Sequence, residues 1–111
     1  MADENEGLTF LNAFAELANR LAADRVVLHS FAYQSESFGR WECEVGRRRV
    51  RIRVSWDGKD KYLLVSTAEL ATGSKERRWA LVEEHDLRGR RPNVTQLLAT
   101  VHAAITAHAG L

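Results

Sequence analysis

The sequence contains a single cysteine, Cys43, which excludes any disulfide bond within the chain. A lone cysteine is typical of proteins from reducing compartments, so we expect a cytoplasmic protein. The sequence also lacks any apolar run near the ~20 residues of a membrane-spanning helix, so no membrane association is expected. Net charge is nearly absent: 16 basic and 15 acidic residues leave a formal charge of +1. That balance gives no overall electrostatic case for a nucleic-acid partner or a membrane surface.

The composition that remains is that of an ordinary globular domain, with 45% hydrophobic and 28% charged residues. A chain of 111 residues fits one domain and buries roughly two-thirds of its unfolded surface. The acidic, polar residues 1–7 carry no targeting pattern and are expected to form a disordered tail. We expect residues 8–111 to form a single domain.

Hydrophobic periodicity predicts the order of the elements. Apolar residues spaced by three and four predict one helix over about 8–23 and another from Val94, which Asn93 and Gln96 begin with a capping box. Between them the period falls to two, which predicts five strands. Their approximate ranges are 26–33, 38–45, 50–56, 62–67 and 77–84. The prediction is therefore an α+β fold: an N-terminal helix, a five-stranded antiparallel meander sheet and a C-terminal helix, with both helices packed on one face of the sheet.

Residues 40–56 read RWECEVGRRRVRIRVSW and predict a β-hairpin with one dry and one wet face. A two-residue turn at Gly46 and Arg47 would set Glu44 against Arg49 and Glu42 against Arg51. The expected dry face holds Trp41, Cys43, Val45, Val50, Ile52, Val54 and Trp56. We expect Trp79 on a dry face as well, and the strand around it to be covered on both sides.

The order of elements resembles that of the small secretion-chaperone-like proteins of bacteria, which also open and close with helices around five antiparallel strands. Those proteins place a helix between the third and fourth strands, where this chain has only Asp57 to Lys61. The resemblance concerns element order, so no residue is carried over from it.

A run of basic residues makes nucleic-acid binding one hypothesis. Its candidate residues are Arg47, Arg48, Arg49, Arg51, Arg53, Lys59 and Lys61. The competing interpretations are a salt-bridged, solvated sheet face and a surface that binds an acidic protein partner. Aromatic platforms for bases are expected beside a nucleic-acid site, and the tryptophans are instead predicted on the dry side.

Catalytic chemistry has little support. Glu83 and His85 share a strand face and allow a carboxylate–imidazole pair, but no nucleophile stands near them in sequence. Cys43 is expected to be a small buried hydrophobe. His29 is expected in the core, and the histidines lack metal-ligand spacing, so we expect no metal and no cofactor.

The sequence therefore favours a non-catalytic cytoplasmic binding protein, with a protein partner, acting as an adaptor or chaperone-like regulator. Sheet edges and an alanine-rich last helix also lead us to expect a homodimer. The first alternative is nucleic-acid binding by the basic hairpin. The second is a small-molecule binder or enzyme with a cavity between sheet and helices, using Glu83, His85 and Cys43.

Overall fold

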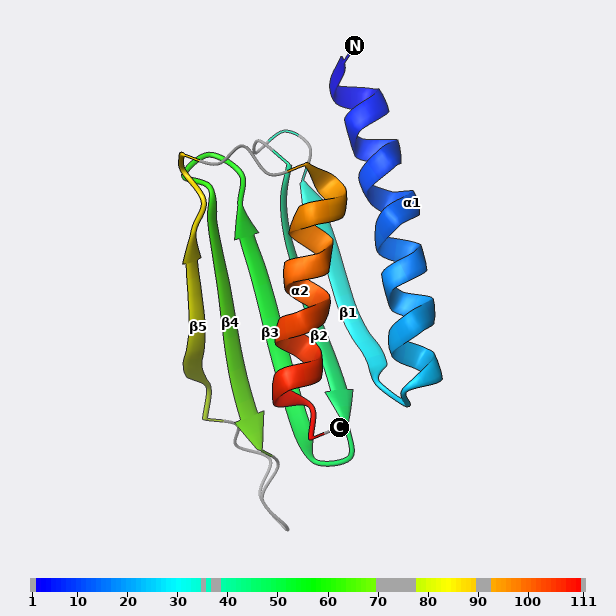
Figure 1. Cartoon of the computed structure of the whole chain (residues 1–111), viewed down its shortest axis with the longest axis vertical. Coiled ribbons are helices and arrows are strands. Elements are labelled where there is room, and N and C mark those ends of the chain that lie inside the picture. The colour runs from blue at the N-terminus through cyan, green and yellow to red at the C-terminus, as the bar shows by residue number, and fades with distance from the viewer. Residues whose placement is uncertain (1, 35, 37–38, 70–77, 90–92, 111) are drawn as a thin grey trace.

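The computed structural model of the chain describes residues 2–34, 36, 39–69, 78–89 and 93–110. The elements follow in the order α1 (Ala2–Ala23), β1 (Val27–Gln34), β2 (Arg40–Arg47), β3 (Val50–Asp57), β4 (Tyr62–Glu69), β5 (Ala80–Asp86) and α2 (Val94–His108). Neighbouring strands are antiparallel and pair in chain order, which makes β1 and β5 the edges of the sheet (Figure 1). The predicted α+β architecture is confirmed.

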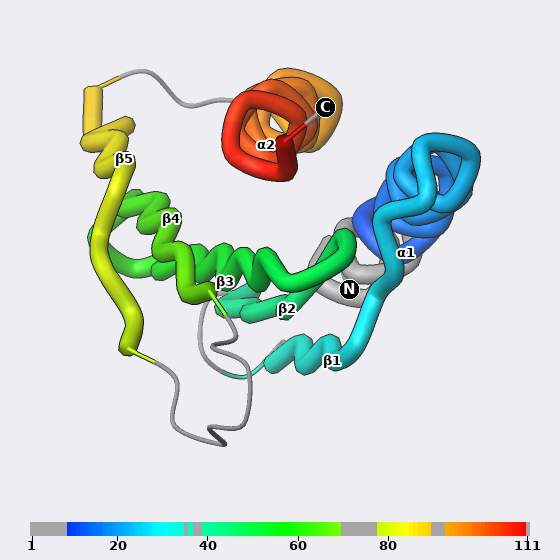
Figure 2. Tube along the Cα trace, turned by 90° about the horizontal axis from the view of Figure 1, so that it is seen from below, coloured from blue at the N-terminus to red at the C-terminus, as the bar shows by residue number. Residues whose placement is uncertain are grey.

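Both helices lie on the same side of the curved sheet (Figure 2). Helix α1 contacts β1 and α2, and α2 contacts β3. The predicted dry face of the hairpin is confirmed, because its alternate apolar residues are buried beneath the helices, with Val50 packed against them. The strand residues of the buried core cluster are Trp41, Cys43, Val45, Ile52, Val54, Trp56, Leu63 and Val65. Their burial is the main term that holds the sheet to the helices.

Aromatic rings join α1 to the β1 side of the sheet. Phe14 stacks on Phe31 with ring centroids 4.3 Å apart. Phe10 packs against Tyr33 at 5.1 Å and against Trp41 at 5.5 Å. Such pairs add about 0.5–1.5 kcal/mol each beyond the area they bury. These contacts hold α1 against β1 and cover the inner face of that strand.

The start of α1 differs from the prediction. The helix begins at Ala2, six residues before the expected start at Leu8, so the segment expected to be a tail is helical from Ala2. No proline interrupts the segment, and alanine and glutamate favour helix extension. The start of α2 agrees with the prediction: Asn93 accepts from the Gln96 backbone N–H at 2.8 Å, and the Asn93 N–H donates to the Gln96 side chain. Neither described helix is long and apolar enough to cross a membrane.

The predicted hairpin register was wrong by four residues. Arg47 pairs with Val50, so the turn is Arg48–Arg49, and Glu44 lies opposite Arg53 instead of Arg49. Gly46 lies within β2, where a Cβ would collide with the Arg51 side chain and come within 2.9 Å of His29 Nε2. Glycine at position 46 therefore lets the Arg51 and His29 side chains lie close to the backbone, and it does not form the turn. A shift of four residues preserves the alternation, which is why the predicted faces survived.

Both edge strands contain a bulge that sequence alternation did not reveal. The pairing with β2 shifts at His29, and the pairing with β4 shifts at Val82. His29 is exposed instead of lying in the core, and β5 is exposed instead of covered on both sides. The predicted strand starts at 38 and 77 lie outside the described residues.

Candidate functional site

The seven basic residues proposed for nucleic-acid binding are spread over four places, of which Arg51 and Arg53 on the open face of the sheet are one. Arg47 lies at the end of β2 on the helix side, where its Nη1 donates to the Gly110 carbonyl at 3.1 Å, just beyond α2. Arg48 and Arg49 form the exposed hairpin turn. Lys59 and Lys61 lie in the β3–β4 turn, at the far end of β3, which its length puts about 25 Å away. The structure does not join them into one surface.

Arg51 and Arg53 point to the open face of the sheet, where they form ion pairs. Arg53 Nε is 3.3 Å from Glu42 Oε1, and its second amino group is 3.8 Å from Glu44. Arg51 Nε is 4.0 Å from Glu44 Oε2. Their positive charges are balanced by these carboxylates, so the open face has less free charge than the sequence indicates.

Trp79 lies on the open face, which corrects its predicted place on a dry face. The Arg53 guanidinium carbon sits 4.1 Å from the centroid of the Trp79 ring. The other two tryptophans, Trp41 and Trp56, are buried as predicted. Trp79 is thus engaged by an arginine and is not an open platform for a base.

A carboxylate between two histidines forms the densest titratable cluster. Glu83 and His85 share the inner face of β5 as predicted, and Oε1 of Glu83 lies 3.0 Å from His85 Nε2. The third member was not indicated by the sequence pattern: His108, from the end of α2, places Nε2 2.7 Å from Glu83 Oε2. Burial raises the pKa of Glu83, but hydrogen bonds from both imidazoles outweigh it and hold the pKa below its usual value.

This cluster joins β5 to α2 and has no nucleophile. Burial raises the pKa of the Cys43 thiol to about 12, which keeps it protonated at neutral pH. Among the described residues, no group of three or more histidine, cysteine or acidic side chains is arranged to hold a metal ion. The geometry therefore fits a structural contact between the sheet and α2 better than an acid–base site.

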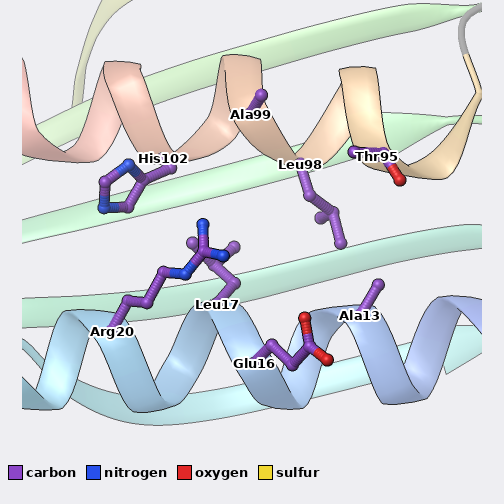
Figure 3. Close-up of a pocket in the computed structure, with 8 residues that line it drawn as sticks. All are labelled: Ala13, Glu16, Leu17, Arg20, Thr95, Leu98, Ala99 and His102. Carbon is purple, nitrogen blue, oxygen red and sulfur yellow. The ribbon is translucent and has the colours of Figure 1, made fainter.

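The hollow between sheet and helices beside Cys43 is too small for a substrate. Its volume is about 10 Å³, and one water molecule needs about 10–15 Å³. A larger, open groove of about 200 Å³ runs between α1 and α2 (Figure 3). Leu17 and Leu98 form its floor, and the side chains of Arg20 and His102 reach into it from opposite helices. Glu16, Thr95 and His102 also line the groove, but among the described residues no hydrogen bond joins them into a catalytic arrangement.

Exposed apolar side chains concentrate on the edges of the sheet. Among the described residues, five large hydrophobic side chains are exposed, and four of them lie on β1 or β5. Val27 and Leu28 are 55% and 40% exposed, and Leu81 and Val82 are 55% and 39% exposed. Edge strands also present unpaired backbone N–H and C=O groups. Each edge therefore combines apolar contact area with free hydrogen-bonding groups.

The chain was compared with protein-family models, with curated proteins and with solved structures. No protein-family model matches the chain, and neither the curated proteins nor the solved structures contain a match.

Proposed function

We propose that this chain is a non-catalytic protein-binding module that takes an extended segment of a partner along an edge of its sheet. The observation that supports the proposal is the position of the exposed apolar residues: Val27 and Leu28 on one edge, Leu81 and Val82 on the other. Strand addition to a sheet edge is a common mode of peptide recognition, in which backbone hydrogen bonds give affinity and side-chain contacts give specificity. This role fits an adaptor or chaperone-like regulator.

The alternatives have less support. Nucleic-acid binding needs free cations, and Arg51 and Arg53 are paired with Glu42 and Glu44. A small-molecule site between sheet and helices needs a cavity, and the space beside Cys43 is about 10 Å³. The lone buried cysteine supports a cytoplasmic location. A homodimer that pairs one edge and leaves the other edge open for the partner segment is part of the proposal, and sedimentation of the wild-type protein tests it.

A peptide-display selection tests the proposed function. Random peptides would be selected on the wild-type protein and then measured on a variant with both edges blocked, Val27→Lys with Val82→Lys. Both positions are exposed, so the fold is expected to survive. We expect the selected peptides to lose at least about 10-fold in affinity for the blocked variant, since each edge loses apolar contact. Equal affinity for both proteins, or no selected peptide, would refute edge binding.

A further inference from the structure

Two turns lie side by side at one end of the sheet. Val27 at the start of β1 pairs with Gly46, one residue before the last residue of β2. The turn that leads from α1 into β1 and the turn between β2 and β3 therefore project from the same end, as Figure 1 shows. The first turn carries Arg25 and the second carries Arg48. Neighbouring turns thus present two arginines beside the start of an edge strand.

Both arginines adopt a backbone conformation that suits glycine. Arg25 has φ 64° and Arg48 has φ 57°. Arg25 follows α1 in a Schellman motif, with hydrogen bonds from its own N–H to the Ala22 carbonyl and from the Val26 N–H to the Leu21 carbonyl. Glycine is the usual residue at such a position, because a Cβ is unfavourable there.

The two arginine side chains have no hydrogen-bonding or ion-pair partner among the described residues. Both residues are exposed. Their charges are therefore available to a ligand, unlike those of Arg51 and Arg53.

Charge distinguishes the two edges of the sheet. Strand β1 contains no acidic residue, and its exposed Val27 and Leu28 begin two residues after Arg25, beyond the buried Val26. Strand β5 carries Glu83, Glu84 and Asp86 beside its own exposed apolar residues. Asp86 is ion-paired with Arg88, and Glu83 lies between His85 and His108. The exposed Glu84 is therefore the carboxylate of β5 that would repel an acidic segment, which would be attracted to the start of β1.

We propose that β1 is the docking edge and that its partner is an extended, acidic segment of another protein, with apolar residues that cover Val27 and Leu28. This inference rests on the proposed function and adds which edge binds and what chemistry the partner has. The bulge at His29 interrupts the regular edge, so it restricts the registers in which a strand adds. The docking edge is thereby selective for sequence as well as for charge.

Fluorescence anisotropy with three labelled probes tests the inference. The probes are a short peptide that alternates glutamate and valine, its lysine–valine counterpart, and a single-stranded oligothymidine of similar length. The test variant combines Arg25→Gly with Arg48→Gly. The matched control is Lys61→Gly, which removes a cation from the same backbone conformation (φ 57°) at the far end of β3.

We expect the wild-type protein to bind the glutamate–valine peptide at low salt, and the double variant to lose about 10-fold in affinity, since two exposed charge contacts are removed. The control is expected to bind like the wild type, and the lysine–valine peptide to bind more weakly than the acidic one. The variants are also expected to unfold at urea concentrations no lower than the wild type, which excludes misfolding as the cause.

The other outcomes overturn the inference in distinguishable ways. If display-selected peptides bind an edge but the double variant keeps full affinity for the acidic peptide, the docking edge is wrong and the proposed function stands. An equal loss in the Lys61→Gly control would show unselective charge attraction and would refute the site. If oligothymidine bound more tightly than the acidic peptide and this binding depended on Arg25 and Arg48, the partner would be a nucleic acid and not a protein. If no peptide binds at either edge, both proposals fail.

Discussion

Replacing Arg25 by glycine is expected to leave the fold at least as stable as the wild type, whereas alanine at this position is expected to destabilise it. Arg25 holds φ 64° after α1. A residue with a Cβ in this conformation costs about 1–2 kcal/mol. Glycine removes that cost. Its greater conformational freedom in the unfolded chain, however, lowers the free energy of unfolding by about 0.4–1 kcal/mol. The glycine variant should therefore exceed the alanine variant by roughly 0.5–1 kcal/mol in free energy of unfolding.

The comparison between glycine and alanine isolates the backbone contribution. Both variants lose the interaction of the Arg25 cation with the C-terminal end of α1, worth about 0.3–1 kcal/mol at an exposed site. That loss cancels in the difference between them, and it offsets part of the glycine gain over the wild type. Urea unfolding followed by the fluorescence of the buried Trp41 and Trp56 measures all three proteins. Equal stability of the two variants would refute a left-handed backbone at residue 25.

Three other predictions follow from the helix cap, the carboxylate cluster and the buried thiol. Asn93→Ala removes the acceptor for the Gln96 N–H and should lower the free energy of unfolding by about 1 kcal/mol in the same urea assay; an unchanged value would contradict the capping box. Because the pKa of Glu83 is held below its usual value in the folded state, its carboxylate stabilises the fold at neutral pH, and this stability is lost as the pH falls through the folded pKa. Glu83→Gln should therefore flatten the acid limb of stability against pH, from about pH 5 downward, and a limb as steep as in the wild type would refute the pairing of Glu83 with His85 and His108. Burial of Cys43, with a pKa of about 12, should slow its reaction with a thiol reagent at pH 8 by at least about 100-fold relative to the unfolded protein, and a fast reaction in the folded state would contradict its place in the core.

Alternation along the strands was enough to predict the two faces of the hairpin, because side-chain period does not depend on which residues pair across strands. Trp41, Cys43 and Ile52 are buried as that pattern indicates. The register was not recoverable in the same way. Glycine is a common turn residue, which made Gly46 the expected turn. The observed turn instead uses Arg48 in a left-handed conformation, which arginine disfavours.

The bulges at His29 and Val82 were also not predictable from the alternation of apolar and polar residues. Each adds one residue to an edge strand and reverses the alternation beyond it, so residues assigned to one face lie on the other. The exposure of β5 follows from its place at the edge, which depends on the order of strands in the sheet. Apolar content alone therefore predicted a covered strand where the structure has an exposed one.

Prediction of the candidate site was partial for similar reasons. The pair Glu83–His85 lies within one strand, and its spacing of two residues was visible in the sequence. His108 is 25 residues away and reaches Glu83 only because α2 packs over the sheet. Arg25 carries one usable sequence signal: α1 ends without a glycine, so another residue must take the left-handed position.

Amide hydrogen exchange on the complex with a display-selected peptide tests edge binding most directly. Outward-facing amides of an edge strand have no partner in the free protein, and an added strand would give them one. Protection is expected to rise by at least about 10-fold on one edge strand, β1 or β5, and to stay unchanged in the groove between α1 and α2. Protection confined to that groove, or to the face that carries Arg51 and Arg53, would contradict recognition through the sheet edge.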